Sequence, residues 1–193
     1  MLILQYRLSV AAFVALVFSV ILRSAVLRRQ GIKAMNFGVT DKTDFVLIPC
    51  VLFVVYILLA NAFRLPIAGI LVLRFWQSEL PGWIGLTFCL LALVFFIYAL
   101  VSFGKSFRVG IDEQSADALI TTGAFAISRN PIYLAFLLFL SGLFLIHSNP
   151  AVAIALLGFY AVIRRQIKRE EEFLESFYGE EYREYQKRVR RFL

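Results

Sequence analysis

The sequence predicts an all-α integral membrane protein with about five transmembrane helices, a polar cytoplasmic loop and a C-terminal helical extension. The first observation is composition: 61% of the 193 residues are hydrophobic and 16% are aromatic. A water-soluble globule of this length could not bury so much apolar surface in one core. The second observation is that long apolar runs alternate with segments rich in Lys and Arg, as they do in membrane proteins.

A transmembrane helix needs about 20 apolar residues at a rise of about 1.5 Å each. Runs near this length occupy residues 2–22, 44–63, 83–102, 131–147 and 151–163. The first run has no basic segment before it and no small-residue cleavage site after it, so it is predicted to be a retained span.

The last two runs are short, but the sequence "HSNP" between them contains Asn149 and Pro150. These residues predict the tight turn of a helical hairpin. The second helix of this hairpin is expected to extend beyond the membrane, because no helix breaker occurs before Gly179.

Residues 64–82 are apolar but are interrupted by Pro66, Arg74 and Pro81. This pattern favours a connector or an interfacial helix over a span. The chain is therefore divided into residues 1–82, with two transmembrane helices and the connector, and a core over residues 83–193.

The basic residues predict the orientation. Segments 23–43, 103–130 and 164–193 contain five, three and nine Lys or Arg, against two in the connector 64–82. The positive-inside rule then places the N-terminus outside and the C-terminus in the cytoplasm. The net charge of +7 is thus interpreted as a topology signal and as affinity for anionic lipid, and no nucleic-acid partner is predicted.

The residue inventory narrows the chemistry. His147 is the single histidine, and the two cysteines, Cys50 and Cys89, lie inside apolar runs without CxxC spacing. No metal site, disulfide framework or histidine-based triad is predicted.

Two segments carry more polar residues than a minimal bundle requires. In residues 103–133, the loop contains Arg108, Asp112, Glu113 and Asp117, and "FRVGI" and "ALITTG" could pair as a short hairpin. Local physics leaves two alternatives open: a ligand-binding loop, or a solvated loop in which Asn130 caps the next helix and Pro131 is its first residue.

The second segment is "RRQIKREEEFLESFYGEEYREYQKRVRRFL", residues 164–193. Successive helical positions differ by 100°, so at most one or two of the carboxylates of Glu170, Glu171 and Glu172 can face the bundle. Ion pairs on the helix surface, and a headgroup-level anchor made of Tyr178, Tyr182, Tyr185 and Arg188–Arg191, are the alternative interpretation. The predicted hairpin brings both segments to the same membrane surface.

The residues of these segments form an ordered pattern: Leu119, Gly123, Phe125, Arg129, Pro131, Tyr133, the pair Glu170-Glu171, Leu174 and "FYGEEYREY". From about residue 83 to 193 the chain resembles the integral membrane methyltransferases that include isoprenylcysteine carboxyl methyltransferase and phosphatidylethanolamine N-methyltransferase. The order and spacing of the residues carry this resemblance, since no single element is specific.

The resemblance implies an enzyme that binds S-adenosylmethionine in a pocket between the last two helices and the preceding loop, and methylates a lipophilic, membrane-embedded acceptor. The implied cofactor-binding residues are Leu119, Gly123, Phe125, Arg129, Asn130, Pro131, Tyr133, Glu170 and Glu171. Arg129, Asn130 and Glu171 are the implied catalytic residues.

One departure from the family pattern concerns the acceptor. The motif of the isoprenylcysteine branch looks like Arg-His-Pro, whereas this chain has Asn130 in place of the histidine. This favours a phospholipid-like acceptor, although the acceptor atom (O, N or S) stays open. Two alternative functions are a nicotinamide-dependent membrane reductase of the steroid-reductase-like group and a non-catalytic protein that binds lipid or a partner.

Overall fold

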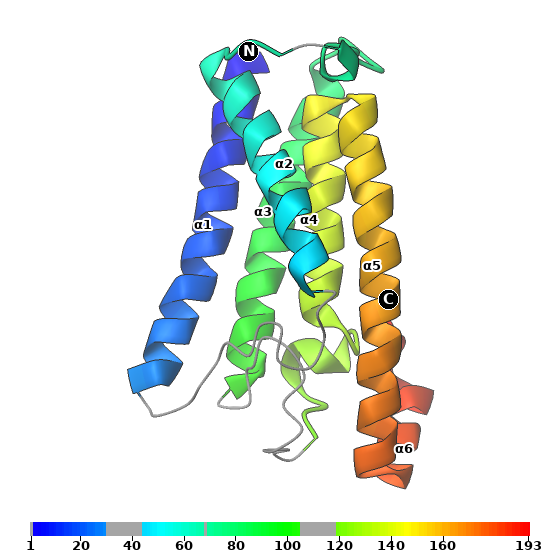
Figure 1. Ribbon diagram of the computed structural model, residues 1–193. Coiled ribbons are helices and arrows are strands. Elements are labelled where there is room, and N and C mark those ends of the chain that lie inside the picture. The colour runs from blue at the N-terminus through cyan, green and yellow to red at the C-terminus, as the bar shows by residue number, and fades with distance from the viewer. Residues whose placement is uncertain (1, 30–43, 68, 105–118) are drawn as a thin grey trace.

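The computed structural model describes residues 2–29, 44–67, 69–104 and 119–193, and in this part of the chain all regular structure is helical (Figure 1). The elements are α1 (Leu2–Arg29), α2 (Asp44–Phe63), η1 (Gly69–Leu71), α3 (Leu80–Ser102), η3 (Gly123–Ala126), α4 (Pro131–His147), α5 (Pro150–Tyr178) and α6 (Glu180–Arg188). The predicted all-α membrane architecture is confirmed.

Each predicted span lies within one of the five long helices. By length and hydropathy, α1, α3 and α5 are long and apolar enough to cross a membrane, whereas α4 and the described part of α2 are shorter apolar helices. The number of five spans and their direction therefore stay predictions. The proposed loop hairpin and the charges of residues 105–118 lie outside the described residues.

In the connector 64–82, the described residues before α3 form the short helix η1 and otherwise irregular backbone, and residues 80–82 are the first turn of α3. The connector therefore does not form a span of its own. It is attached to the turn between α4 and α5. The backbone N–H of Phe75 donates to Ser148 O at 2.7 Å, and the indole N–H of Trp76 donates to Leu145 O at 3.2 Å. The connector thus closes one end of the bundle, the upper end in Figure 1.

The core is centred on α3 and α4, which approach closely because small residues face each other. A Cβ on Gly85 would lie 2.5 Å from Gly142 O, so only glycine permits this approach. Cys89 is fully buried beside the same contact, with its Sγ 3.7 Å from Phe139 O. Cys89 is thus a packing residue of the α3–α4 contact, and the side chain of Cys50 is outside the described part.

The α4–α5 turn has the predicted hairpin geometry. Ser148 adopts a left-handed backbone with φ 44°, and Pro150 is the first residue of α5. The side-chain Oδ1 of Asn149 accepts from Val152 N at 2.9 Å, which caps α5. The start of α4 and the far end of α5 therefore lie at the same end of the bundle, the lower end in Figure 1.

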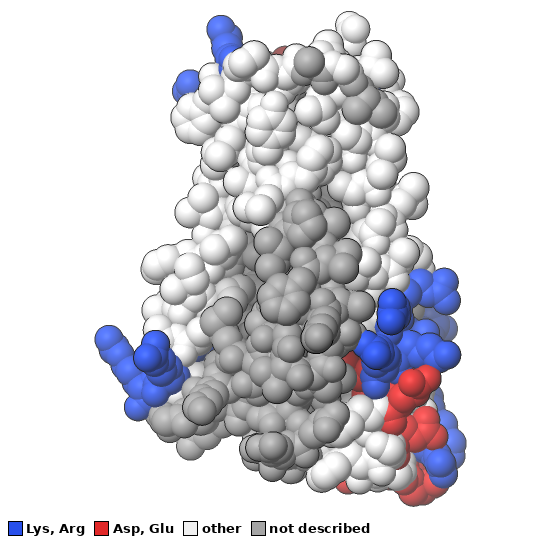
Figure 2. Space-filling view, viewed as in Figure 1, with Lys and Arg blue, Asp and Glu red and all other residues white. Residues whose placement is uncertain are grey.

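Gly179, with φ +56°, ends α5 and lets the chain reverse into α6. The short α6 lies beside the lower part of α5 (Figure 1). Charged side chains gather over this region and at the lower end of α1 (Figure 2). On this face most of the charged side chains of the described residues thus lie toward the end where α4 begins, and a few basic ones lie at the upper end.

Candidate functional site

Residues 127–130 connect η3 to α4 and present several polar groups at the lower end of the bundle. Pro131 is the first residue of α4, and Asn130 occupies the N-cap position, as predicted. The prediction that the Asn130 side chain caps the helix is wrong, because that side chain makes no capping hydrogen bond. Its Nδ2 instead donates to Arg191 O at 3.1 Å, so the amide binds the C-terminal tail.

The tail, residues 189–193, is fastened to this turn through its backbone. Arg190 O accepts from Arg129 N at 3.0 Å, and Arg191 O accepts from the hydroxyl of Ser128 at 3.1 Å as well as from Asn130. Because backbone carbonyls make these three hydrogen bonds, they do not depend on the side chains of Arg190 and Arg191.

An ion cluster of Arg129, Glu171 and Arg191 forms the centre of the site. Arg129 Nη2 lies 3.2 Å from Glu171 Oε1, and Arg191 contacts Glu171 Oε2 through Nη2 at 2.5 Å and through Nε at 3.1 Å. These are charge-assisted hydrogen bonds. The bonds to Glu171 raise the pKa of Arg191 above its usual range.

Burial differs within this cluster. The side chains of Glu171 and Arg129 are 8% and 11% exposed, whereas that of Arg191 is 41% exposed. Arg129 Nε is also buried without a hydrogen-bond partner among the described residues. The cluster therefore has two arginines on one enclosed carboxylate, with Arg191 on the solvent side.

Glu170 points toward α4. Its Oε1 accepts from the hydroxyl of Tyr133 at 2.6 Å and from Gln166 Nε2 at 3.1 Å. Glu172 is exposed and lies 3.7 Å from Lys168 on the helix surface. Of the three consecutive glutamates, the first two thus face the protein and the third faces outward, which agrees with the limit set by helical geometry.

The helix η3 forms the packed base of the site. Gly123 has φ +63°, and a Cβ there would collide with the side chain of Ser102, whose hydroxyl accepts from Ala124 N at 3.0 Å. The ring of Phe125 packs edge-on against Phe103 at 4.8 Å. Gly123 and Phe125 were predicted to contact a cofactor. Because both are tightly packed, such a contact would involve their backbone or a small part of their surface.

Leu119 and Pro131 complete the predicted set. Leu119 is half-buried just before η3, and Pro131 is fully buried at the start of α4. The structure thus brings Arg129, Asn130 and Glu171 together with the tail, whereas Tyr133 and Glu170 form a separate hydrogen-bonded pair between α4 and α5.

Tyr182 and Tyr185 are buried in the protein. The alternative interpretation that placed both in a headgroup-level anchor is therefore wrong for these two residues. They are 1% and 2% exposed, and the hydroxyl of Tyr185 donates to Phe125 O at 2.6 Å. Burial raises the pKa of Tyr185 to about 12, and burial together with the charge of Glu171 raises that of Tyr182. Their spacing of three residues on one helix face was the available signal.

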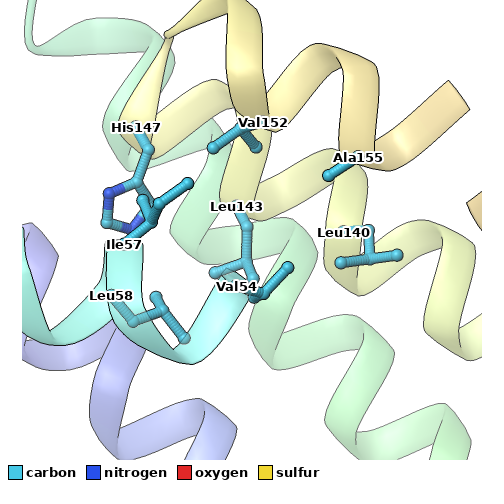
Figure 3. A pocket seen from close by; sticks show the side chains of 8 residues that line it. All are labelled: Val54, Ile57, Leu58, Leu140, Leu143, His147, Val152 and Ala155. Atoms are coloured by element: carbon cyan, nitrogen blue, oxygen red, sulfur yellow. The ribbon is translucent and has the colours of Figure 1, made fainter. Parts of the chain in front are cut away.

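Other polar or hollow features lie toward the opposite end. His147 and seven apolar residues line a small pocket between α2, α4 and α5 (Figure 3): Val54, Ile57, Leu58, Leu140, Leu143, Val152 and Ala155. Trp76 packs edge-on against Phe144 at 5.3 Å at that same end. Within the described residues, no three His, Cys, Asp or Glu form a group that could hold a metal.

Comparisons with known proteins find similarity over the second half of the chain. Residues 80–181 match the phospholipid methyltransferase family. The chain is 34% identical over 111 residues to protein-S-isoprenylcysteine O-methyltransferase B of Arabidopsis thaliana, covering 54% of this chain and 55% of that protein.

A probable protein-S-isoprenylcysteine O-methyltransferase of Oryza sativa subsp. indica is 32% identical over 111 residues, covering 56% of this chain and 58% of the rice protein. The protein-S-isoprenylcysteine O-methyltransferase of Tribolium castaneum is 31% identical over 109 residues, covering 55% of this chain and 39% of the beetle protein. The matched part thus spans somewhat more than half of each plant relative and less of the beetle one. With α3 to α5 and the start of α6 inside the matched region, the chain belongs to the phospholipid methyltransferase family.

Proposed function

We propose that this protein is an S-adenosylmethionine-dependent methyltransferase of the cytoplasmic membrane that acts on a lipophilic acceptor. The observation that carries the proposal is the cluster of Arg129, Glu171 and Arg191 at one end of an apolar helical bundle. Family membership and the names of the relatives support methyl transfer to a membrane-associated lipid.

The residues of this region fit the polar groups of the donor. A carboxylate such as Glu170 can accept from ribose hydroxyls or from an ammonium group, and a guanidinium can pair with a carboxylate. The buried Arg129 Nε, which has no hydrogen-bond partner among the described residues, is a donor that a ligand oxygen could satisfy. We assign the binding of the donor to Arg129, Tyr133, Glu170 and Glu171, with Gly123 and its neighbours against it.

When bound, S-adenosylmethionine supplies a methyl group on a positively charged sulfur, and transfer requires mainly alignment with the acceptor. The protein contributes orientation and a site shielded from bulk water. Glu171 and Arg129 are held by their mutual ion pair and by the tail, so they are ordered before any ligand binds. Such preorganisation suits a reaction that depends on positioning.

The acceptor stays a proposal at the level of a class: a phospholipid amine, a carboxylate or a similar small lipid. Asn130 gave the sequence-based reason to favour a phospholipid over an isoprenylcysteine carboxylate. In the structure its amide binds Arg191 O, so this residue reports on docking of the tail rather than on the acceptor. An isoprenylcysteine-like carboxylate is therefore kept beside the phospholipid amine in this class.

The test is equilibrium binding of S-adenosylmethionine and of NADPH to the protein purified in detergent, followed by a screen of lipid extracts with methyl-labelled donor. Saturable donor binding without NADPH binding, and label transferred to a lipid, are expected. Binding of NADPH alone would identify the reductase alternative, and binding of neither would leave a non-catalytic protein.

A further inference from the structure

We propose that Arg191 is a donor-binding residue that holds the carboxylate of the methionyl group of S-adenosylmethionine. This inference rests on the proposed function. Arg191 lies ten positions beyond residues 80–181, the region that matches the family, so neither the match nor the motif assigns it a role.

The geometry of the guanidinium supports this role. Arg191 uses Nε and Nη2, one edge of its planar fork, to bind Glu171. The second edge, formed by one N–H of Nη1 and the other N–H of Nη2, is bonded to no described residue. A guanidinium binds a carboxylate through a pair of parallel N–H groups, so this second edge can accept another carboxylate.

Exposure distinguishes Arg191 from Arg129. Arg129 is enclosed at 11% exposure, whereas Arg191 is 41% exposed, so a ligand arriving from water meets Arg191 first. Glu171 fixes the orientation of the Arg191 fork without neutralising the cluster, because two guanidinium groups share one carboxylate. The remaining positive charge favours an anionic group at this position.

The side chain of Arg191 can be replaced without removing the backbone hydrogen bonds that dock the tail. The carbonyls of Arg190 and Arg191 bind residues 128–130, so replacing the Arg191 side chain keeps those three hydrogen bonds. Loss of the side chain is therefore expected to affect binding at the exposed edge more than attachment of the tail.

The experiment compares S-adenosylmethionine with decarboxylated S-adenosylmethionine, which lacks only the carboxylate, by equilibrium binding to the full chain in detergent. The unmodified protein is expected to bind the decarboxylated donor at least about tenfold more weakly, as for loss of a charge-assisted hydrogen bond. Arg191→Ala should weaken binding of the natural donor by a similar factor and leave binding of the decarboxylated donor nearly unchanged. Arg191→Lys, which keeps the charge but not the fork, should give an intermediate preference.

Arg188→Ala is the matched control, because it removes one positive charge at the end of α6, just before the tail, and its Nε donates to Glu184 O at 3.4 Å. It should keep the full preference for the carboxylate. Equal affinity of the unmodified protein for both donors, or an equal loss of both in Arg191→Ala, would overturn the role of Arg191 while leaving the proposed function standing. Absence of binding of either donor to the unmodified protein would reject both proposals.

Discussion

Both ends of the helical bundle bury polar side chains, but with different chemistry. At the upper end, the hydroxyl of Ser9 lies 3.3 Å from His147 Nε2, Tyr6 stacks on the imidazole at 5.1 Å, and Gln5 binds Glu79 O. These groups join α1 to α4 and the connector. At the lower end, Arg129, Glu171 and Arg191 place charges together, and one of them is substantially exposed.

This difference helps to distinguish a polar cluster that joins helices from one that could bind a ligand. The upper cluster consists of short contacts that join elements, and no acidic side chain bonds directly to its histidine in the described residues. The lower cluster combines the enclosed carboxylate of Glu171, an excess of positive charge and the solvent-facing guanidinium group of Arg191. Changes at the lower end should therefore alter ligand binding, whereas changes at the upper end should alter only stability.

The largest effect is expected for Glu171→Gln. It leaves two arginines, one of them enclosed, without their carboxylate, which should lower the free energy of unfolding by about 3 kcal/mol. Donor affinity should fall more than tenfold, because the site loses the group that orients both guanidinium groups. Thermal unfolding in detergent and donor binding would measure these effects.

Glu172→Gln is the control for that substitution, since Glu172 is exposed and pairs only loosely with Lys168 at 3.7 Å. Its effect on stability should be within about 0.5 kcal/mol. Equal effects of the two substitutions would show that position on the helix face does not matter.

The next largest effect on stability is expected for Gly123→Ala. A left-handed backbone costs about 1–2 kcal/mol for a residue with a Cβ, and the new methyl group would collide with Ser102. Gly158→Ala, in the interior of α5 with no atom within 4 Å of the added Cβ, should instead stabilise the protein by up to about 1 kcal/mol. Denaturation of both variants tests the opposite signs, and the same sign for both would contradict this packing of η3.

Tyr185→Phe removes the hydrogen bond to Phe125 O and should cost about 1 kcal/mol at neutral pH. Because burial raises the pKa of Tyr185 to about 12 from an ordinary value of 10, its contribution is present below pH 10 and is lost as the pH rises through 12. The stability difference between the unmodified protein and the variant should therefore shrink between pH 10 and 12. A difference that stays constant over this range would contradict the buried hydroxyl.

The smallest effect is expected at the upper end, for Ser9→Ala. The hydroxyl donates to Tyr6 O at 2.7 Å, so His147 Nε2 must be the donor to Ser9. Losing this bond within the membrane should cost about 0.6 kcal/mol. Donor affinity should be unchanged, and a several-fold loss would mean that the two ends are coupled.

The helices could be predicted from sequence because apolar run length and turn residues are local signals. Asn149 and Pro150 specified the hairpin, and the hairpin brought residues 129–133 near Glu170 and Glu171. The place of the C-terminal tail could not be predicted, because it depends on carbonyl groups of Arg190 and Arg191 that any sequence possesses. Arg191 looked like one more basic residue at a membrane surface, and only the reversal at Gly179 brings it back to Glu171.

The resemblance contributed what local physics left open, namely the implied role of the arginine and the glutamates in binding a methyl donor. It also led to an interpretation of Asn130 as a guide to the acceptor. In the structure, however, the side-chain amide of Asn130 donates a hydrogen bond to Arg191 O in the tail. The motif residues thus predicted the region that is proposed as the donor site, but their individual contacts depend on the packing of segments distant in sequence.

The most direct measurement of the central claim is the dissociation constant of S-adenosylmethionine for the unmodified protein, Glu171→Gln and Ser9→Ala, determined in one detergent at one pH. Saturable binding that is weakened more than tenfold in Glu171→Gln and preserved in Ser9→Ala is the predicted result. No saturable binding, or equal binding by all three proteins, would contradict a donor site at the Glu171 end.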